Sequence, residues 1–254
     1  MHSQPPEHSV FCAFEPSKAV HALAGGLTFS MGDSPHPICV LAASDLQKHL
    51  QEQQDWEHNF GLSSGTKGAI IGKMFGVLVV RTQQNELGYL SAFSGKLANG
   101  NYHNKFVPPL FDGMAEGGFL NAGMRELTRI GEAINQLEQE THAAEIQRLK
   151  TLRKTHSHAL QNKIFEQYNF LNKAGVSKKL VDVFKDAGYK KPPAGAGECA
   201  APKLLQYAFQ HAMEPLALAE FWWGLSPKSE TWKHGHYYAP CKEKCGPILA
   251  HMLG

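Results

Sequence analysis

The hydrophobic pattern of this chain separates three strand-like segments from one long segment of helical periodicity. Residues 75–82 are apolar almost throughout, as expected of a central strand, and residues 87–93 form a second strand pattern. A short polar loop that contains an asparagine joins them, which predicts an antiparallel hairpin. Residues 216–223 are another apolar run and predict a buried strand.

Apolar spacing also predicts several short helices around these strands. Residues 40–54 form an amphipathic helix whose apolar stripe consists of Val40, Leu41, Leu46 and Leu50. Another helix is expected to start at Cys199, because a Gly-rich turn precedes it and Pro202 suits a first helical turn. Residues 176–187 and 248–252 predict two more short helices.

The longest helical pattern lies between the second and third strands. No Gly or Pro interrupts residues 132–173. A single helix of that length would extend about 60 Å, so the segment either projects as one arm or folds back as a helical hairpin. We therefore expect residues 1–124 to form the first half of a core, residues 125–190 a helical insertion, and residues 191–254 the second half. The predicted fold is α/β, with helices flanking one sheet.

Three of the five cysteines lie in the last region, at the expected starts of two helices. Cys199 precedes the first helix, and Cys241 and Cys245 precede the second. A helix N-terminus favours negative charge and lowers a thiol pKa, so all three cysteines can offer thiolates to one point. A tetrahedral zinc would take the three thiolates together with a water, His234 or His236. The alternative is three partly buried free cysteines.

The order of these parts resembles the zinc-dependent cytidine deaminase superfamily. A cysteine on one helix is followed by a strand and then by Pro240-Cys241-Lys-Glu-Lys-Cys245 on the next helix. The resemblance implies a three-layer, deaminase-like core of strand hairpin, helix, strand and helix with a zinc site. That family has a proton-shuttling Glu two residues after its first ligand, where this chain has Ala201, and its cysteine pair is spaced Cys-x-x-Cys. Glu198 and Glu220 are therefore the candidate catalytic carboxylates.

A closer resemblance covers nearly the whole chain. Similarity to the amino-terminal region of long-form RluA-type RNA pseudouridine synthases is carried by Gly72-Lys-Met-Phe-Gly-Val-Leu-Val-Val80, Pro193-Ala-Gly-Ala-Gly-Glu-Cys-Ala-Ala-Pro-Lys203 and Ala219-Glu-Phe-Trp-Trp-Gly224. The resemblance implies an accessory domain that recognises or positions structured RNA, either rRNA or tRNA, for uridine isomerisation. The catalytic domain of that family, with its His-Arg-Leu-Asp motif, has no counterpart here. This chain alone is therefore expected to be inactive as an isomerase.

Composition supports a folded protein and limits where RNA could bind. Hydrophobic residues make up 43% of the chain, and the formal net charge is only +2. Any RNA contact would therefore have to be local. The candidate RNA-binding residues come from one helical cluster and one polar loop, and they are Arg148, Lys150, Arg153, Lys154, Lys96 and Lys105. Such a basic run is also typical of a solvated helix face.

Two further patterns have the residue types of nucleotide recognition. Residues 61–68, Gly-Leu-Ser-Ser-Gly-Thr-Lys-Gly, are similar in composition to a phosphate-binding loop. They lack the Gly-Lys-Ser/Thr that opens a helix in a P-loop, and they lead into a strand pattern, so nucleoside triphosphate binding is not predicted there. The aromatic residues Trp222, Trp223, Tyr237 and Tyr238 could stack a base, or could belong to the core.

The number of cysteines and the first residues of the chain predict its cellular compartment. Five cysteines, an odd number, favour a reducing compartment and metal or core roles over a disulfide framework. The first residues lack the basic and apolar regions of a signal peptide, and the apolar runs are far shorter than the ~20 residues that span a bilayer. We therefore expect a cytoplasmic protein without membrane contact.

Three functions fit these observations. The leading hypothesis is an accessory region of an RNA pseudouridine synthase. The second is a zinc-dependent deaminase that acts on a nucleoside or base. The third is an inactive relative of such a deaminase that serves as a protein-interaction module through its helical insertion.

Overall fold

A computed structural model describes residues 10–138, 142–227 and 231–254 and shows a mixed α/β fold. Its main sheet has the strand order β1-β4-β3-β7-β2, and β8 also pairs with β7. The strands of this sheet are β1 (Cys12–Ala13), β2 (Ser30–Met31), β3 (Lys73–Arg81), β4 (Leu87–Phe93), β7 (Glu214–Trp223) and β8 (Tyr237–Tyr238). The predicted α/β class is therefore confirmed.

The predicted strand hairpin forms the middle of this sheet. β3 pairs antiparallel with β4 from Phe75 opposite Phe93 to Arg81 opposite Leu87. Asn85 in the connecting turn has a φ of 63°, a left-handed conformation that asparagine tolerates better than most residues. The predicted strand at residues 216–223 is β7, which pairs antiparallel with the other edge of β3. β2 adds a short parallel edge to β7.

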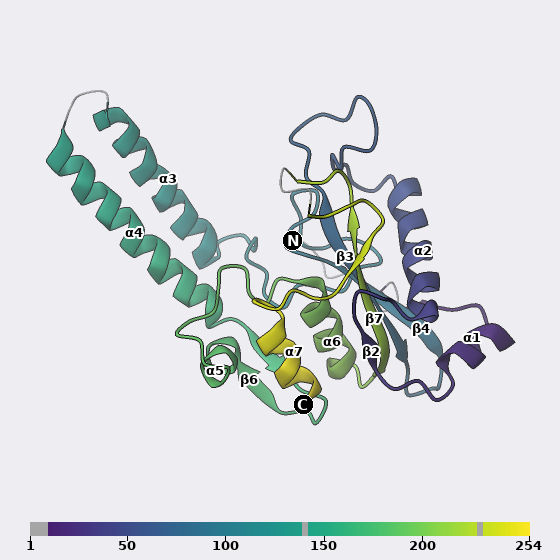
Figure 1. The fold of residues 1–254 in the computed structure, drawn as a ribbon. Coiled ribbons are helices and arrows are strands. Elements are labelled where there is room, and N and C mark those ends of the chain that lie inside the picture. The colour runs from purple at the N-terminus through teal and green to yellow at the C-terminus, as the bar shows by residue number, and fades with distance from the viewer. Residues whose placement is uncertain (1–9, 139–141, 228–230) are drawn as a thin grey trace.

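Helices cover both faces of the sheet and give it three layers (Figure 1). On one face lie α1 (Lys18–Ala24) and α2 (Pro37–Glu52), and on the other lie α6 (Ala200–Gln210) and α7 (Gly246–Leu253). Alternate residues of β3 enter the two cores: Leu78 packs on the α6 side, and Val77 and Val79 pack on the α2 side. This two-sided burial explains why the β3 segment is apolar almost throughout.

A glycine in β3 lets α6 lie close to the sheet. A Cβ placed on Gly76 would lie 3.0 Å from the Cβ of Ala200 and 3.1 Å from Cδ1 of Leu204. Gly76 stands opposite Glu220 in the pairing of β3 with β7. The start of α6, with Cys199 immediately before it, is therefore held directly over these two strands.

The helix predicted at residues 40–54 is α2, but its buried face differs from the predicted stripe. Val40 and Leu41 are exposed, at 38% and 45% of their surface. The buried face instead consists of Ile38, Cys39, Ala42, Ala43, Leu46 and Leu50. The small residues Cys39, Ala42 and Ala43 face the sheet because they allow a close approach, and periodicity of large apolar residues alone pointed to the wrong stripe.

The long helical segment folds back as a hairpin. Its helices are α3 (Phe119–Glu138) and α4 (Ala143–Phe165), which project from the core (Figure 1). Leu127, Ile130 and Ile134 form the buried side of α3. A Cβ on Gly123 would lie 2.6 Å from Cδ1 of Leu160, so this glycine lets the two helices pack closely. Of the two forms that the sequence allowed, the structure has the hairpin.

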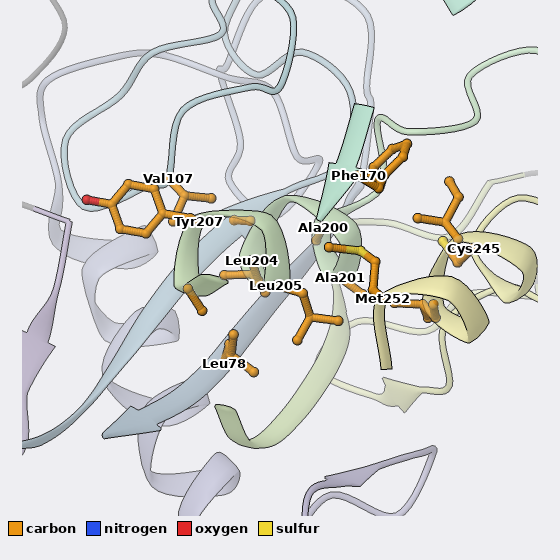
Figure 2. Close-up of a cluster of buried hydrophobic side chains, with 14 of the residues drawn as sticks. Leu78, Val107, Phe170, Ala200, Ala201, Leu204, Leu205, Tyr207, Cys245 and Met252 are labelled. Atoms are coloured by element: carbon orange, nitrogen blue, oxygen red, sulfur yellow. The ribbon is translucent and has the colours of Figure 1, made fainter. Parts of the chain in front are cut away.

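The segment after the hairpin belongs to the core, although the sequence placed it in the insertion. The helical pattern of the sequence extends to residue 173, but α4 ends at Phe165, and β5 (Asn169–Leu171) and β6 (Ser177–Lys179) follow as a small antiparallel sheet. The helix predicted at residues 176–187 is the shorter α5 (Leu180–Asp186). Phe170, Leu180 and Phe184 are fully buried. Figure 2 shows Phe170 in one cluster with Ala201, Cys245 and Met252.

The hairpin should therefore be removable while the segment that follows it is not. We expect a chain in which about four Gly and Ser residues replace residues 132–152 to unfold cooperatively, with a midpoint within about 4 °C of the full chain. Gly131 and Arg153 lie opposite each other, since a Cβ on Gly131 would be 3.8 Å from Nε of Arg153, so a short linker can join them. Circular dichroism during heating measures both midpoints.

The contrasting variant is Phe170→Ala, which should cost about 3–5 kcal/mol because it empties a fully buried position. A shortened chain without a cooperative transition would show that the outer hairpin stabilises the core.

Candidate metal centre

The sulfur atoms of Cys199, Cys241 and Cys245 lie together between the starts of α6 and α7. All three are within 4.8 Å of one another. The Sγ atoms of Cys241 and Cys245 are 3.4 Å apart. The prediction that these three cysteines meet at the starts of two adjacent helices is confirmed.

The Cys-x-x-x-Cys spacing works here because Cys241 to Cys245 forms one helical turn before α7. The N–H of Cys245 donates to the carbonyl oxygen of Cys241 at 3.1 Å. Residues four apart on a helical turn lie on the same side, so both sulfurs point to one place. Cys245 is then the residue from which α7 begins.

Cys199 reaches the same point through a glycine turn. Gly195 and Gly197 have φ values of 75° and 93°, where a side chain is strained. A Cβ on Gly197 would also lie 2.8 Å from the ring of Tyr168. Cys199 itself is extended and caps α6. The glycines therefore set the direction from which Cys199 enters the centre.

The three thiols influence one another strongly. Hydrogen bonds from Cys199 and Cys245 lower the pKa of Cys241. The contact with Cys241, together with burial, raises the pKa of Cys199, although the contact with Cys245 opposes the rise. The contacts with Cys199 and Cys241, together with burial, raise the pKa of Cys245. One thiolate is therefore stabilised by two neighbouring S–H groups, while three thiolates would repel one another at this distance. A bound cation removes that repulsion, so the cluster can hold a metal ion.

The arrangement fits a thiophilic metal. Two sulfurs on one zinc lie about 3.5–4 Å apart, because each Zn–S bond is ~2.3 Å at a tetrahedral angle. The observed separations, from 3.4 Å to within 4.8 Å, require only small side-chain adjustments to reach that geometry. Cys245 is buried, Cys199 is half-buried and Cys241 is exposed, so the centre has one side open to solvent.

Neither candidate histidine joins the cluster formed by the described residues. Nδ1 of His234 accepts a hydrogen bond from the N–H of Gly224 at 3.1 Å, and its ring lies 4.4 Å from that of Trp223. The carbonyl of His236 accepts from the N–H of Trp222 at 3.0 Å. The ligand group therefore consists of the three cysteines, without His234 or His236.

Glu220 lies beside the cysteines and is buried, with 4% of its surface exposed. Its Oε1 accepts a hydrogen bond from the backbone N–H of Ala201 at 3.0 Å. Burial raises the pKa of Glu220 to about 7, although the bond from Ala201 opposes the rise, and Cys241 contributes to it. A carboxyl group that can gain or lose a proton near neutral pH thus lies next to the position where Ala201 replaces the expected Glu.

Glu198, the other candidate carboxylate, points elsewhere. Its Oε1 is 3.3 Å from the hydroxyl of Tyr168, which donates to it. Burial lowers the pKa of Lys73, and the charge of Glu198 partly offsets that effect. Glu198 therefore belongs to a polar group with Tyr168 and Lys73 rather than to the ligand cluster.

Sequence reasoning missed Lys203, which is 5% exposed. Its Nζ donates to the carbonyl oxygens of Phe93 at 2.9 Å and Gly95 at 3.3 Å. Burial lowers the pKa of Lys203 to about 8. The sequence feature that could have indicated its burial is its position four residues after Cys199 in an apolar helix. A lysine in such a helix usually extends its ammonium group to solvent, so burial was not predicted. Lys203 ties the start of α6 to the end of β4.

The predicted RNA-binding residues differ in their partners. Lys150, Arg153 and Lys154 line a hollow of about 610 Å³ between α3 and α4. Lys150 pairs with Glu138 at 2.8 Å, and Arg148 pairs with Glu145 at 2.7 Å. Lys105 pairs with Asp45 at 2.8 Å. Lys96 is exposed in the loop after β4.

Comparisons with known proteins leave this centre to be interpreted from its own residues. No protein-family model, curated protein or solved structure matches the chain. Among the described residues, no helix combines the length and the apolar character that crossing a membrane would require. The chemistry of the centre therefore follows from its thiols, Glu220 and their surroundings.

The cluster should bind one divalent metal ion per chain. We expect Cys199→Ser, Cys241→Ser and Cys245→Ser each to weaken cobalt(II) binding by more than about 100-fold, since loss of even a supporting residue costs about 10- to 100-fold. Absorption of the cobalt–thiolate band during titration of the reduced protein measures the affinity. Cys12→Ser is the control, because Cys12 lies on β1 outside the cluster. Equal affinity in Cys12→Ser and Cys199→Ser would contradict this assignment.

Glu220 should make the metal-free protein less stable as pH rises. Its pKa is 4.5 when unperturbed and about 7 in the folded chain, so between these values the folded state binds the proton that the unfolded state has lost. Between pH 5 and pH 8, the free energy of unfolding of Glu220→Gln should rise by up to about 3 kcal/mol relative to that of the native chain. Gln can still accept the bond from Ala201.

Urea unfolding of the metal-free native chain and of Glu220→Gln at pH 5 and at pH 8 measures the two free energies of unfolding. Glu214→Gln, which alters an exposed carboxylate on the same strand, should follow the native protein. A constant difference between Glu220→Gln and the native chain across this range would contradict the prediction.

Proposed function

We propose that this chain is a zinc-binding accessory domain of an RNA pseudouridine synthase. The observation that supports zinc binding is the convergence of three cysteine sulfurs within 4.8 Å. The role in RNA modification is supported by the resemblance of three segments, residues 72–80, 193–203 and 219–224, to the amino-terminal part of that enzyme family. Structured RNA, either rRNA or tRNA, is then the partner, and the cytoplasm is the compartment.

In this proposal zinc would stabilise the fold and would have a water in its fourth position; that open position is more typical of catalytic zinc and favours the second candidate below. Three thiolates from two helix starts would bind it, and a bound metal would fix α6 and α7 relative to the sheet. Glu220 and Lys203 would hold the start of α6 in place through their bonds to Ala201 and to the end of β4. The centre would thereby stabilise the domain on which the helical hairpin is mounted.

The hairpin is the part of the domain best placed to contact RNA. It projects from the core (Figure 1), and Arg153 and Lys154 line the hollow between its helices. Neither Arg153 nor Lys154 forms an ion pair with another described residue. Because the whole chain is nearly neutral, binding would depend on such local positive groups and would weaken with salt.

A zinc-dependent deaminase is the second candidate, and the position of Glu220 favours it. Sheet order β4-β3-β7, with β3 antiparallel to both neighbours, supports a deaminase-like core, as do the two cysteine-bearing helix starts. Zinc held by the three cysteines would supply an activated water for such a reaction, and a carboxylate would carry the proton. Glu220, which contacts the backbone of Ala201, would supply that carboxylate from β7 instead of α6. If the centre is inactive, the interaction module is the remaining alternative.

The pseudouridine synthase proposal predicts zinc without isomerase activity in this chain. We expect about one zinc per chain by mass spectrometry of the metal, and tritium release from labelled rRNA or tRNA at background, because the sequence contains no Arg-Leu-Asp motif. A gel-shift assay should show binding to one of these RNAs that weakens with Arg153→Glu and Lys154→Glu. Absence of binding to both RNAs would contradict the accessory role.

The same purified chain tests the deaminase hypothesis against the accessory role. Incubation with cytidine, adenosine, guanine and single-stranded RNA should give little or no product, because the motif position is Ala201. Product that disappears with Glu220→Gln but persists with Glu198→Gln would establish the second candidate in place of the first.

A further inference from the structure

We propose that a second site, on the α2 side of the sheet, binds an unpaired nucleotide of single-stranded RNA. This inference deepens the RNA role proposed above and rests on it. The site is a hollow of about 1000 Å³ that we call the aromatic hollow. It is lined chiefly by Trp56, His58, Phe60, Trp223, His234 and Lys67. None of these residues belongs to the cysteine centre or to the helical hairpin.

The floor of the aromatic hollow is rigid. Phe60 and Trp223 are 9% and 4% exposed, and both belong to the core between the sheet and α2. The ring of Trp56, which is half-buried, lies 6.3 Å from that of Phe60. Trp56 therefore offers an accessible face on which a base can stack, while the two buried rings support it, and such stacking tolerates any base.

Two histidine rings extend this aromatic surface. Nε2 of His58 is 2.8 Å from the carbonyl oxygen of Ile71, and its Nδ1 accepts from the N–H of Ala98 at 3.4 Å. This pairing fixes one neutral tautomer of His58. Its ring lies 4.5 Å from that of Phe60, and the ring of His234 lies 4.4 Å from that of Trp223. The histidines therefore present flat uncharged faces beside the larger rings.

The loop at residues 61–68 supplies groups for a phosphate at the edge of the hollow. Asn59 holds this loop: its Nδ2 donates to the carbonyl oxygens of Thr66 and Gly68 at 3.1 and 3.0 Å. Ser63, Ser64 and Thr66, which carry hydroxyl groups, are among the residues that line the hollow. Lys67 also lines it and forms no ion pair with another described residue. One ammonium and several hydroxyls thus lie next to the stacking surface.

The composition of the hollow favours a nucleotide in a strand over the other ligands considered. A peptide groove would not need an ammonium and hydroxyls placed beside stacked rings. A nucleoside triphosphate site would need a loop that opens a helix, whereas this loop leads into β3. Glu57 is the one carboxylate among the described lining residues, so the hollow would accommodate a single phosphate near Lys67 better than a chain of phosphates.

Binding of a fluorescein-labelled oligouridylate of about eight nucleotides to the full chain tests the proposal. We expect Trp56→Ala to weaken binding by about 10-fold and Trp56→Phe to retain most of it, because a stacked base needs an aromatic face. Lys67→Ala should reduce the slope of log affinity against log salt by about 0.7, as expected for one lost contact to a single-strand phosphate. Lys185→Ala, which alters an exposed lysine on α5, is the control.

Unchanged affinity and salt slope in Lys67→Ala, together with unchanged affinity in Trp56→Ala, would overturn the proposal. Binding of uridine monophosphate as tight as that of the oligonucleotide would overturn it too, because the site would then recognise a free nucleotide. Folding of each variant is checked by its thermal midpoint, and Lys67→Ala removes no described core contact. The expected result is about 10-fold weaker oligonucleotide binding in Trp56→Ala and a reduced salt slope in Lys67→Ala, while both variants retain binding to structured rRNA or tRNA.

The aromatic hollow and the accessory role in RNA modification are tested by different outcomes. Structured RNA that binds through Arg153 and Lys154 while the hollow variants behave as the native chain would contradict the hollow alone. Failure of every RNA to bind the native chain would contradict the accessory role as well.

Discussion

Three thiols packed within 4.8 Å cannot all ionise unless a cation lies among them, and much of this fold serves to hold them there. α6 can approach the sheet because β3 has Gly76 beneath Ala200. The turn from Cys241 to Cys245 directs two sulfurs toward the start of α6, and Phe170 belongs to the same buried cluster as Cys245 (Figure 2). Two buried polar side chains position α6 through hydrogen bonds: Glu220 accepts from the N–H of Ala201 in its first turn, and Lys203 donates to the carbonyl oxygen of Phe93 at the end of β4.

Two buried ionisable side chains beside the cysteines, Glu220 and Lys203, are unusual for a site that only binds a structural metal. A carboxyl group with a pKa near 7 and a lysine with a pKa near 8 are both costly to bury, and each is retained beside the thiols. A purely structural site would gain more from apolar neighbours. Their presence is the physical reason for weighing a deaminase against an accessory domain, even though Ala201 stands where that reaction would use a Glu.

The sequence predicted the elements that local periodicity determines and missed those that depend on distant contacts. The strand hairpin, β7, the two cysteine-bearing helices and the meeting of Cys199 with Cys241 and Cys245 followed from spacing and motif order. The buried stripe of α2 did not, because small residues rather than Val40 and Leu41 face the sheet. Residues 165–184 belong to the core because β5 and α5 pack against α6 and α7, which are distant in the sequence. Helical periodicity within the segment does not reveal such contacts. Lys203 and the aromatic hollow likewise required the assembled structure.

X-ray absorption at the zinc edge, on the chain purified under reducing conditions, tests the central claim most directly. The account predicts a first shell of three sulfurs at ~2.3 Å and one oxygen or nitrogen atom at about 2.0 Å. The light atom would be a water, because neither His234 nor His236 joins the described cluster. A chain that contains no zinc, or zinc surrounded only by oxygen and nitrogen, would contradict the assignment of Cys199, Cys241 and Cys245 as a metal centre.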